Sequence, residues 1–111
     1  MERSGQFSET ISNYLRHNWR LRRVLLRPET RAEIGDAAQT LFADAPVEEA
    51  EVDALWFARP SHAGREAWEL RLMADSPYAL FETFEPDEAE EEREELRREM
   101  EARLREYANR A

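Results

Sequence analysis

The residues best suited to acid–base or metal chemistry in this chain are two histidines, His17 and His62, and there is no cysteine. The histidines lie in different predicted elements, and neither has the spacing of a metal-ligand set. Ser61 precedes His62, but neighbours in a sequence form no dyad unless something orients the imidazole. Three glycines are too few for a phosphate-binding loop. We therefore predict a protein that is not an enzyme and has no catalytic residue, metal site or cofactor.

Arginine offers a different chemistry, because guanidinium groups bind phosphate while tryptophan stacks on bases. All sixteen basic residues are arginines, which is typical of a GC-rich prokaryotic genome. In a helix, Trp19 would lie beside a stripe of four of them: Arg16, Arg20, Arg23 and Arg27. The stripe is a candidate contact for nucleic acid or for an acidic partner. A net charge of −9 and a pI of about 4.8 argue against nucleic acid.

The alternative for these arginines is a solvated face, or a contact with the acidic C-terminal helix of the same chain or of a second copy. The charge pattern permits this, since residues 1–31 hold seven arginines and three glutamates, a balance of +4. Residues 32–111 hold nine arginines and 22 acidic residues, a balance of −13. A basic head and an acidic tail indicate either self-complementarity or two different partners.

Two further surfaces are candidates for binding a protein partner. The first is one face of the predicted sheet, which collects apolar side chains between polar ones: Leu55, Phe57, Met73 and Phe81. If no helix covers it, it is an exposed apolar patch, which is typical of an interface, most often that of a homodimer. The alternative is that the second or the last helix covers it. The other surface is acidic and would steer the protein toward a basic partner through Glu91, Glu94 and Glu95.

Periodicity predicts two helices before the sheet, over residues 8–27 and 29–43. Apolar residues recur at intervals of three and four in both segments. Pro28 separates them, because the residue before a proline avoids the helical region and a proline suits the first helical turn. Gly35 weakens the second helix by about 1 kcal/mol relative to alanine.

Alternation predicts a three-stranded antiparallel meander over residues 51–59, 65–74 and 78–84. Loop lengths place Trp56 opposite Trp68 and Leu72 opposite Leu80, and one face then becomes almost wholly apolar. That face consists of Val52, Ala54, Trp56, Ala58, Trp68, Leu70, Leu72, Ala74, Tyr78, Leu80 and Phe84. Glu82 interrupts it and is expected to pair with Arg22 or to reach solvent. The segment 47–59 also contains good helix formers, so an all-helical fold is the alternative.

A long acidic helix is predicted over residues 87–110, starting with a capping box of Asp87 and Glu90. The fold class is therefore α+β, in a single domain of 111 residues. No segment has the length and apolarity of a membrane span, so we expect a cytoplasmic protein. The favoured function is a small regulator, adaptor or inhibitor that binds another protein, and a nucleic-acid-binding regulator is the alternative.

Overall fold

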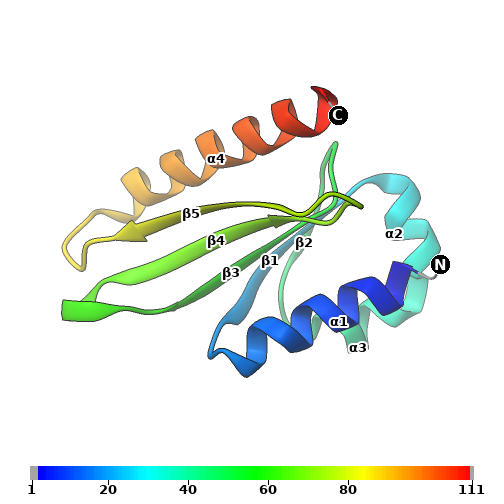
Figure 1. Ribbon diagram of the computed structural model, residues 1–111, viewed down its shortest axis with the longest axis horizontal. Coiled ribbons are helices and arrows are strands. Elements are labelled where there is room, and N and C mark those ends of the chain that lie inside the picture. The colour runs from blue at the N-terminus through cyan, green and yellow to red at the C-terminus, as the bar shows by residue number, and fades with distance from the viewer. Residues whose placement is uncertain (1–2, 111) are drawn as a thin grey trace.

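The computed structural model describes residues 3–110, which form a five-stranded mixed sheet with helices on both faces (Figure 1). The elements in chain order are α1 (Arg3–Arg16), β1 (Arg20–Leu26), α2 (Pro28–Ile34), the 3-10 turn η1 (Gly35–Ala37), α3 (Ala38–Phe42), β2 (Val47–Glu49), β3 (Ala54–Pro60), the 3-10 turn η2 (His62–Gly64), β4 (Glu66–Leu72), β5 (Tyr78–Phe84) and α4 (Glu90–Arg110). The strand order is β2-β1-β3-β4-β5, with only β1 and β2 parallel. The predicted α+β class is confirmed, whereas the sheet has two strands more than predicted.

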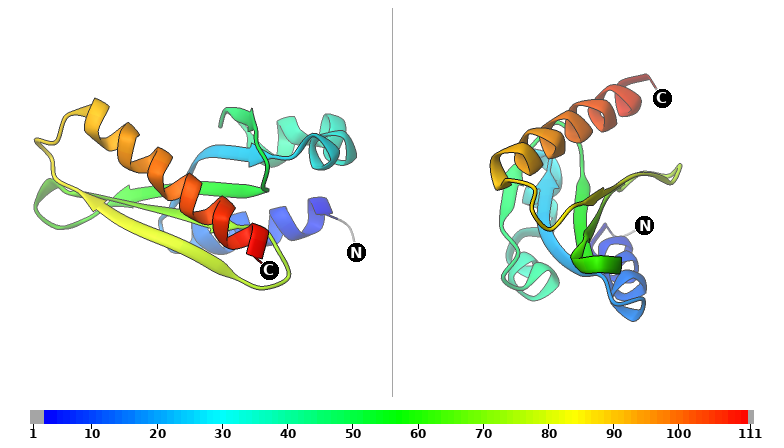
Figure 2. Two further views of the ribbon diagram at one scale, coloured as in Figure 1. Left: turned by 90° about the horizontal axis from the view of Figure 1, so that it is seen from above. Right: turned by 90° about the vertical axis from the view of Figure 1, so that its left-hand side faces the viewer.

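Helices form the two outer layers, which Figure 2 shows on opposite sides of the sheet. The long helix α4 runs diagonally across one face, and α1, α2 and α3 lie against the other. The sheet face under α4 carries the apolar set predicted from alternation, and most of it is buried together with Met100 and Leu104 of α4. The opposite face is buried against the N-terminal helices in a second cluster: Phe7, Ile11, Trp19, Val24, Leu26, Ile34, Phe42, Leu55, Phe57 and Ala67.

The helix predicted over residues 8–27 is wrong in its second half. Helix α1 ends at Arg16, and Asn18 has a positive φ of 68°, while the Trp19 N–H donates to Tyr14 O at 3.1 Å. Asparagine is one of the few non-glycine residues that adopt this conformation readily, so it stops the helix. The chain then turns back as β1, whose last residues, Val24–Leu26, are all buried because β1 has a layer on each face.

The second predicted helix, residues 29–43, is broken into two short helices. Pro28 occupies the first turn of α2 as expected. Gly35 then has a φ of +54°, and the chain passes through η1 before α3. After α3 the chain forms the short strand β2, which pairs in parallel with β1. Strand β2 was not predicted, because three residues show no periodicity.

The meander is confirmed, and the all-helical alternative is wrong. The register differs by two residues from the prediction, since Trp56 lies opposite Leu70 and Leu72 opposite Tyr78. The centre of each hairpin turn lies one residue from its expected position, and this moves every residue pair of the hairpin by two. A shift of two residues preserves which side chains share a face, so the apolar face is retained. The rings of Trp56 and Trp68 still meet edge to face, with centroids 5.8 Å apart.

The C-terminal helix is also confirmed, but its predicted start is wrong. Helix α4 begins at Glu90, so Asp87 is not at the N-cap. In the preceding turn, Glu88 Oε1 accepts the N–H of Glu85 at 2.9 Å instead.

Candidate protein interface

One arginine of the basic N-terminal region, Arg23, pairs with the acidic helix α4 of the same chain. Leu21 lies opposite Phe57 and Arg23 opposite Trp56, so Arg22 is an extra residue in β1, a β-bulge. The bulge allows two consecutive side chains to reach the α4 side of the sheet. Arg23 donates two hydrogen bonds to the Glu94 carboxylate, at 2.6 and 3.1 Å. For Arg23, one of the four arginines of the predicted stripe, the contact with the acidic helix of the same chain is therefore the observed one.

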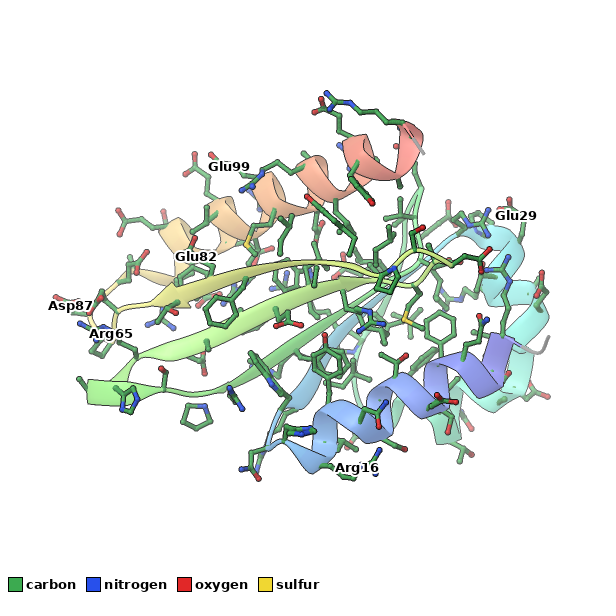
Figure 3. The ribbon with its side chains drawn as sticks, viewed as in Figure 1. Arg16, Glu29, Arg65, Glu82, Asp87 and Glu99 are labelled. Atoms are coloured by element: carbon green, nitrogen blue, oxygen red, sulfur yellow. The ribbon has the colours of Figure 1, made fainter. Side chains whose placement is uncertain are left out.

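The predicted pair of Arg22 and Glu82 is not formed. The guanidinium of Arg22 lies 5.1 Å from the centroid of the Trp68 ring. Glu82, labelled in Figure 3, lies between β5 and α4 and accepts the N–H of Thr83 at 3.2 Å. Arg22 is exposed and Glu82 half-buried, so both reach solvent, which was the alternative expectation.

A buried arginine, Arg97, is the centre of the charged contacts under α4. Its side chain is 3% exposed and donates to Glu90 at 2.8 Å and Glu94 at 2.9 Å. Its guanidinium lies 3.9 Å from the centroid of the Trp68 ring, in cation–π contact. The hydrogen bond from Arg23, followed by that from Arg97, lowers the pKa of Glu94. Arg97 was not among the predicted residues, although its spacing from Met100 and Leu104 places it in the inward stripe of α4.

A second carboxylate of α4 also turns inward. The fully buried Trp56 donates its indole N–H to Glu101 Oε2 at 2.7 Å. Burial raises the pKa of Glu101, and the bond from Trp56 opposes that effect. The indole thereby gains a hydrogen-bond partner, and one carboxylate is no longer available on the outer side of α4.

On the other face of the sheet, the buried carboxylate of Asp53 holds three segments together. It is 4% exposed and accepts hydrogen bonds from the Arg27 N–H at 2.9 Å, from Arg3 at 2.9 Å and from the buried Thr30 hydroxyl at 2.7 Å. A hollow of about 570 Å³ opens beside it. Because Asp53 neutralises both guanidiniums at this hollow, we interpret the cluster as a structural clasp between β1, α1 and α2.

The predicted apolar interface is mostly buried inside the molecule. Leu55 and Phe57 are fully buried beneath α1, and Met73 is half-buried. Tyr14 of α1 stacks on Phe57, with ring centroids 3.9 Å apart. Of the four predicted residues only Phe81 is largely exposed, at 57%. The patch is therefore covered, as the alternative expected, but α1 stacks on it, and not the second or the last predicted helix alone.

Tyr14 also links α1 to β4 through a polar contact. Its hydroxyl donates to the Glu69 carboxylate, with Arg71 close by. Burial, and then the bond to Glu69, raises the pKa of Tyr14 to about 12. The phenol is therefore a neutral donor at physiological pH and a packing group.

Phe81 belongs to a small aromatic and polar cluster at the β5 side of this face. The Trp19 ring meets it edge to face at 6.3 Å, and Arg59 stacks on Trp19 at 4.5 Å. Arg59 also donates to His17 O at 2.9 Å. Beside Phe81 is a hollow of about 540 Å³, lined by Asn18, Arg59, Pro60, Ser61, His62, Ala67 and Phe81. The structure thus brings the loops of both histidines to one place.

The arginine stripe predicted for nucleic acid is not formed, because the helix that would carry it ends at Arg16. Arg16 bonds to Asn13, Arg20 is exposed on β1, Arg23 pairs with Glu94 and Arg27 with Asp53. Trp19 is 7% exposed and faces the sheet. These side chains therefore point to different parts of the molecule.

The predicted acidic residues do come together. Glu91, Glu94 and Glu95 line one hollow of about 590 Å³ with Glu90, Arg23 and Arg98. Glu91 and Glu95 are exposed, whereas Glu94 is turned inward and paired. Glu99, labelled in Figure 3, lies on the side of α4 that faces away from the sheet.

Two features are absent from the described residues 3–110. No helix among them is both long and apolar enough to cross a membrane. Within the same range, no three His, Asp or Glu side chains are grouped so that they could hold a metal ion. The chain was compared with protein-family models, with curated proteins and with solved structures, and none of the three comparisons found a match.

Proposed function

We propose that this protein is a non-enzymatic protein-binding module, a small regulator, adaptor or inhibitor that binds a partner with a basic surface. The observation that carries the proposal is the segregation of charge on α4. Arg93 and Arg97 turn toward the sheet, where they contact Phe84 and Trp68. The exposed acidic residues of α4 are Glu90, Glu91, Glu92, Glu95, Glu99 and Glu106, against three exposed arginines, Arg98, Arg103 and Arg110.

Such a surface acts mainly through electrostatics. Acidic side chains along one rigid helix raise the rate of encounter with a basic partner and disfavour acidic ones. Internal placement matters for this proposal, because Arg93 and Arg97 are used inside the fold and, apart from the bond of Arg97 to Glu90, do not neutralise the outer side of the helix. Nucleic acid gains no support, since the basic residues are dispersed or paired.

The test is capture of a partner from host lysate with the tagged protein, in nuclease-treated and untreated halves. The proposal expects one stoichiometric protein in both halves. Reversal of Glu91 and Glu95 to arginine should release it without unfolding the protein, because both side chains are exposed. Glu94 is left unchanged, since its reversal would also break the contact with Arg23.

The matched control reverses two exposed acidic residues of the N-terminal layer, Glu9→Arg and Asp44→Arg, and so changes the net charge equally. Capture should survive this control. Partner binding that is equally weakened by both double variants, or that is lost on nuclease treatment, would contradict the proposal. The salt dependence of the captured complex gives a further measure, since rim charges act mainly on the association rate.

A further inference from the structure

The edge strand β5 carries an open row of backbone groups. At the two ends of β4, the Ser61 N–H donates to Arg65 O and the Met73 N–H donates to Asp53 O. The backbone groups of odd-numbered residues in this segment therefore point toward β3. Backbone groups alternate in direction along a strand, so even-numbered residues of β4 face β5. With Leu70 opposite Leu80, the even-numbered residues of β5 are those bonded to β4. The N–H and C=O groups of Ala79, Phe81 and Thr83 therefore point away from the sheet.

Little protects this edge from pairing with another strand. The other edge strand, β2, has three residues, two of them glutamates, whereas β5 has seven. Proteins usually shield long edges with charges, prolines or bulges. On β5 the one charged side chain is Glu82, which occupies the outward Thr83 N–H at 3.2 Å. A carboxylate that reaches solvent can leave this donor when a competing acceptor arrives.

A side-chain site lies next to the open edge. Phe81 projects at the middle of β5, 57% exposed, and forms one wall of the hollow that His62 and Asn18 also line. Strand addition takes its affinity from main-chain hydrogen bonds and its specificity from such side-chain pockets. Phe81 and Ala67 offer apolar contact, so the hollow suits an aromatic side chain of an added strand.

The charges around β5 select among the strands that could add there. Glu82 lies on the strand, the exposed Glu85 and Asp87 follow its end, and the exposed Asp75 precedes its start. Arg65 pairs with Glu85, and within the described residues Asp75, Glu82 and Asp87 form no ion pair. Arg71, opposite Ala79, and Arg59, beside Phe81, lie on the side-chain face opposite to Glu82. A second copy would bring together two chains with a charge of −9 each and two copies of Glu82. An added strand with basic side chains is favoured instead.

We propose that the free edge of β5 binds an extended, basic segment of a partner protein as a sixth strand. An aromatic side chain of that segment occupies the hollow beside Phe81, and its basic side chains meet Glu82 and the acidic residues at the two ends of β5. The proposal deepens the proposed protein-binding function, on which it rests, but uses a surface separate from the outer side of α4. The two surfaces can therefore fail independently.

The test uses a defined probe, a fluorescent nine-residue peptide that alternates arginine with valine and has tyrosine at one central valine position. Its control has the same composition with the arginines gathered at one end. The measurement is made at about 0.15 M salt, where exposed charges are screened beyond about 8 Å. The alternating peptide should bind at least about tenfold tighter than its control, because only the alternating order places the arginines on one face of an added strand and the tyrosine on the other. Equal affinity of the two peptides would overturn the proposal.

Amide hydrogen exchange, measured by NMR on the complex, compares the outward and the inward N–H groups of β5 directly. The amides of Ala79, Phe81 and Thr83 should become protected from hydrogen exchange on peptide binding. Those of Leu80 and Glu82, already bonded to β4, should keep their exchange rates. Protection without this alternation, or at sites outside β5, would place the peptide elsewhere and refute strand addition.

Two variants complete the test. Ala79→Pro removes an outward N–H and leaves the β4 ladder intact, because a proline is tolerated where its missing donor faced solvent; Ala79→Ser is its control. Phe81→Arg adds charge without altering the backbone and covers the case in which the proline variant does not fold. Ala79→Pro and Phe81→Arg should each lower the affinity for the alternating peptide about tenfold or more. Unchanged affinity in both would contradict the proposal.

The lysate partner separates this inference from the proposed function. If Ala79→Pro and Phe81→Arg retain the partner while the Glu91 and Glu95 reversal releases it, strand addition is wrong and the acidic-helix function stands. If the reverse holds, β5 is the binding site and the role given to α4 is wrong. Concentration-dependent dimers of the wild-type protein that disappear in Ala79→Pro would assign the edge to a second copy and overturn the basic-segment proposal.

Discussion

Each face of the sheet has a buried charged side chain beneath its helical layer, and the two charges are opposite in sign. Under α4 the buried charge is a guanidinium, Arg97, surrounded by carboxylates. Under the N-terminal layer it is a carboxylate, Asp53, surrounded by guanidiniums and the Thr30 hydroxyl. Both centres lie in the acidic part of the sequence, residues 32–111. Arg97 neutralises carboxylates of that same part, whereas Asp53 neutralises Arg3 and Arg27 of the basic part.

The two centres differ in how well their partners reach water. Thr30 is fully buried, and the Arg27 N–H belongs to a fixed backbone, so neither can find another acceptor without rearrangement. Glu90 is 70% exposed, and Glu94 keeps a bond from Arg23. Removing a buried charge is most costly when it leaves the partners unsatisfied. The Asp53 centre should therefore be the more sensitive of the two.

The largest expected effect on stability is the difference between truncating Asp53 and truncating Arg97. Asp53→Ala should lower the free energy of unfolding by about 3–5 kcal/mol, because it leaves the Thr30 hydroxyl and the Arg27 N–H without an acceptor. Arg97→Ala should cost about 2 kcal/mol, chiefly through lost packing on Trp68. Urea unfolding of both variants measures the difference, with the exposed Asp75→Ala as the control. An Arg97 cost equal to or above that of Asp53 would refute the comparison.

A smaller effect depends on pH. The hydrogen bond from Arg23 lowers the folded pKa of Glu94, so this carboxylate stabilises the fold above its unfolded pKa of about 4.3 and loses the effect as pH falls through the folded value. Glu94→Gln should cost about 1 kcal/mol at pH 7, within the range of half-exposed ion pairs. The difference in the free energy of unfolding between this variant and the wild-type protein should disappear at acid pH. Urea melts at pH 7 and pH 3 check this, and a constant gap would exclude the ion pair as its cause.

The next variant separates charge from packing at Arg97. Methionine matches the aliphatic part of arginine and can cover Trp68 and Phe84 without needing Glu90. Arg97→Met should therefore change the free energy of unfolding by less than about 1 kcal/mol, well below the cost of Arg97→Ala. Thermal and urea unfolding of the two variants side by side give the answer. Similar losses in both would mean that the guanidinium, and not its packing, holds α4.

The smallest effect is a gain. Burial raises the folded pKa of Glu101, so its ionised form weakens the fold at neutral pH, and Glu101→Gln removes that cost while a carbonyl still accepts the Trp56 indole N–H. We expect a gain of about 0.5 kcal/mol at pH 7 that vanishes as pH falls below the unfolded pKa. The control is the exposed Glu99→Gln. A loss of stability at pH 7 would mean that the charge on Glu101 strengthens its bond to Trp56 by more than burial costs.

Local patterns predicted the meander, its apolar face and the last helix because alternation and i, i+4 spacing act over a few residues. They failed at β1, where Leu21 and Leu25 fit a helix as well as a strand, and where the deciding residue was Asn18, a helix stop that carries no periodicity. They also failed at Arg97, since burial of a charge depends on partners distant in the sequence. The hollow beside Phe81 requires the turn at Asn18, the end of β3 and the strand β5 together, which spacing alone does not reveal.

The order of elements along the chain has a consequence for synthesis. Helix α4 leaves the ribosome after all five strands, yet it covers the face that holds Trp56, Trp68 and Phe84. Until Leu104 emerges, a nascent chain that has already formed its hairpins displays these aromatic side chains, together with the open strand β5. Exposed apolar surface next to an unpaired edge is the combination that chaperones recognise and that aggregates in crowded solution. The interval between emergence of the hairpins and emergence of α4 is therefore the one in which this protein is most exposed to misassembly.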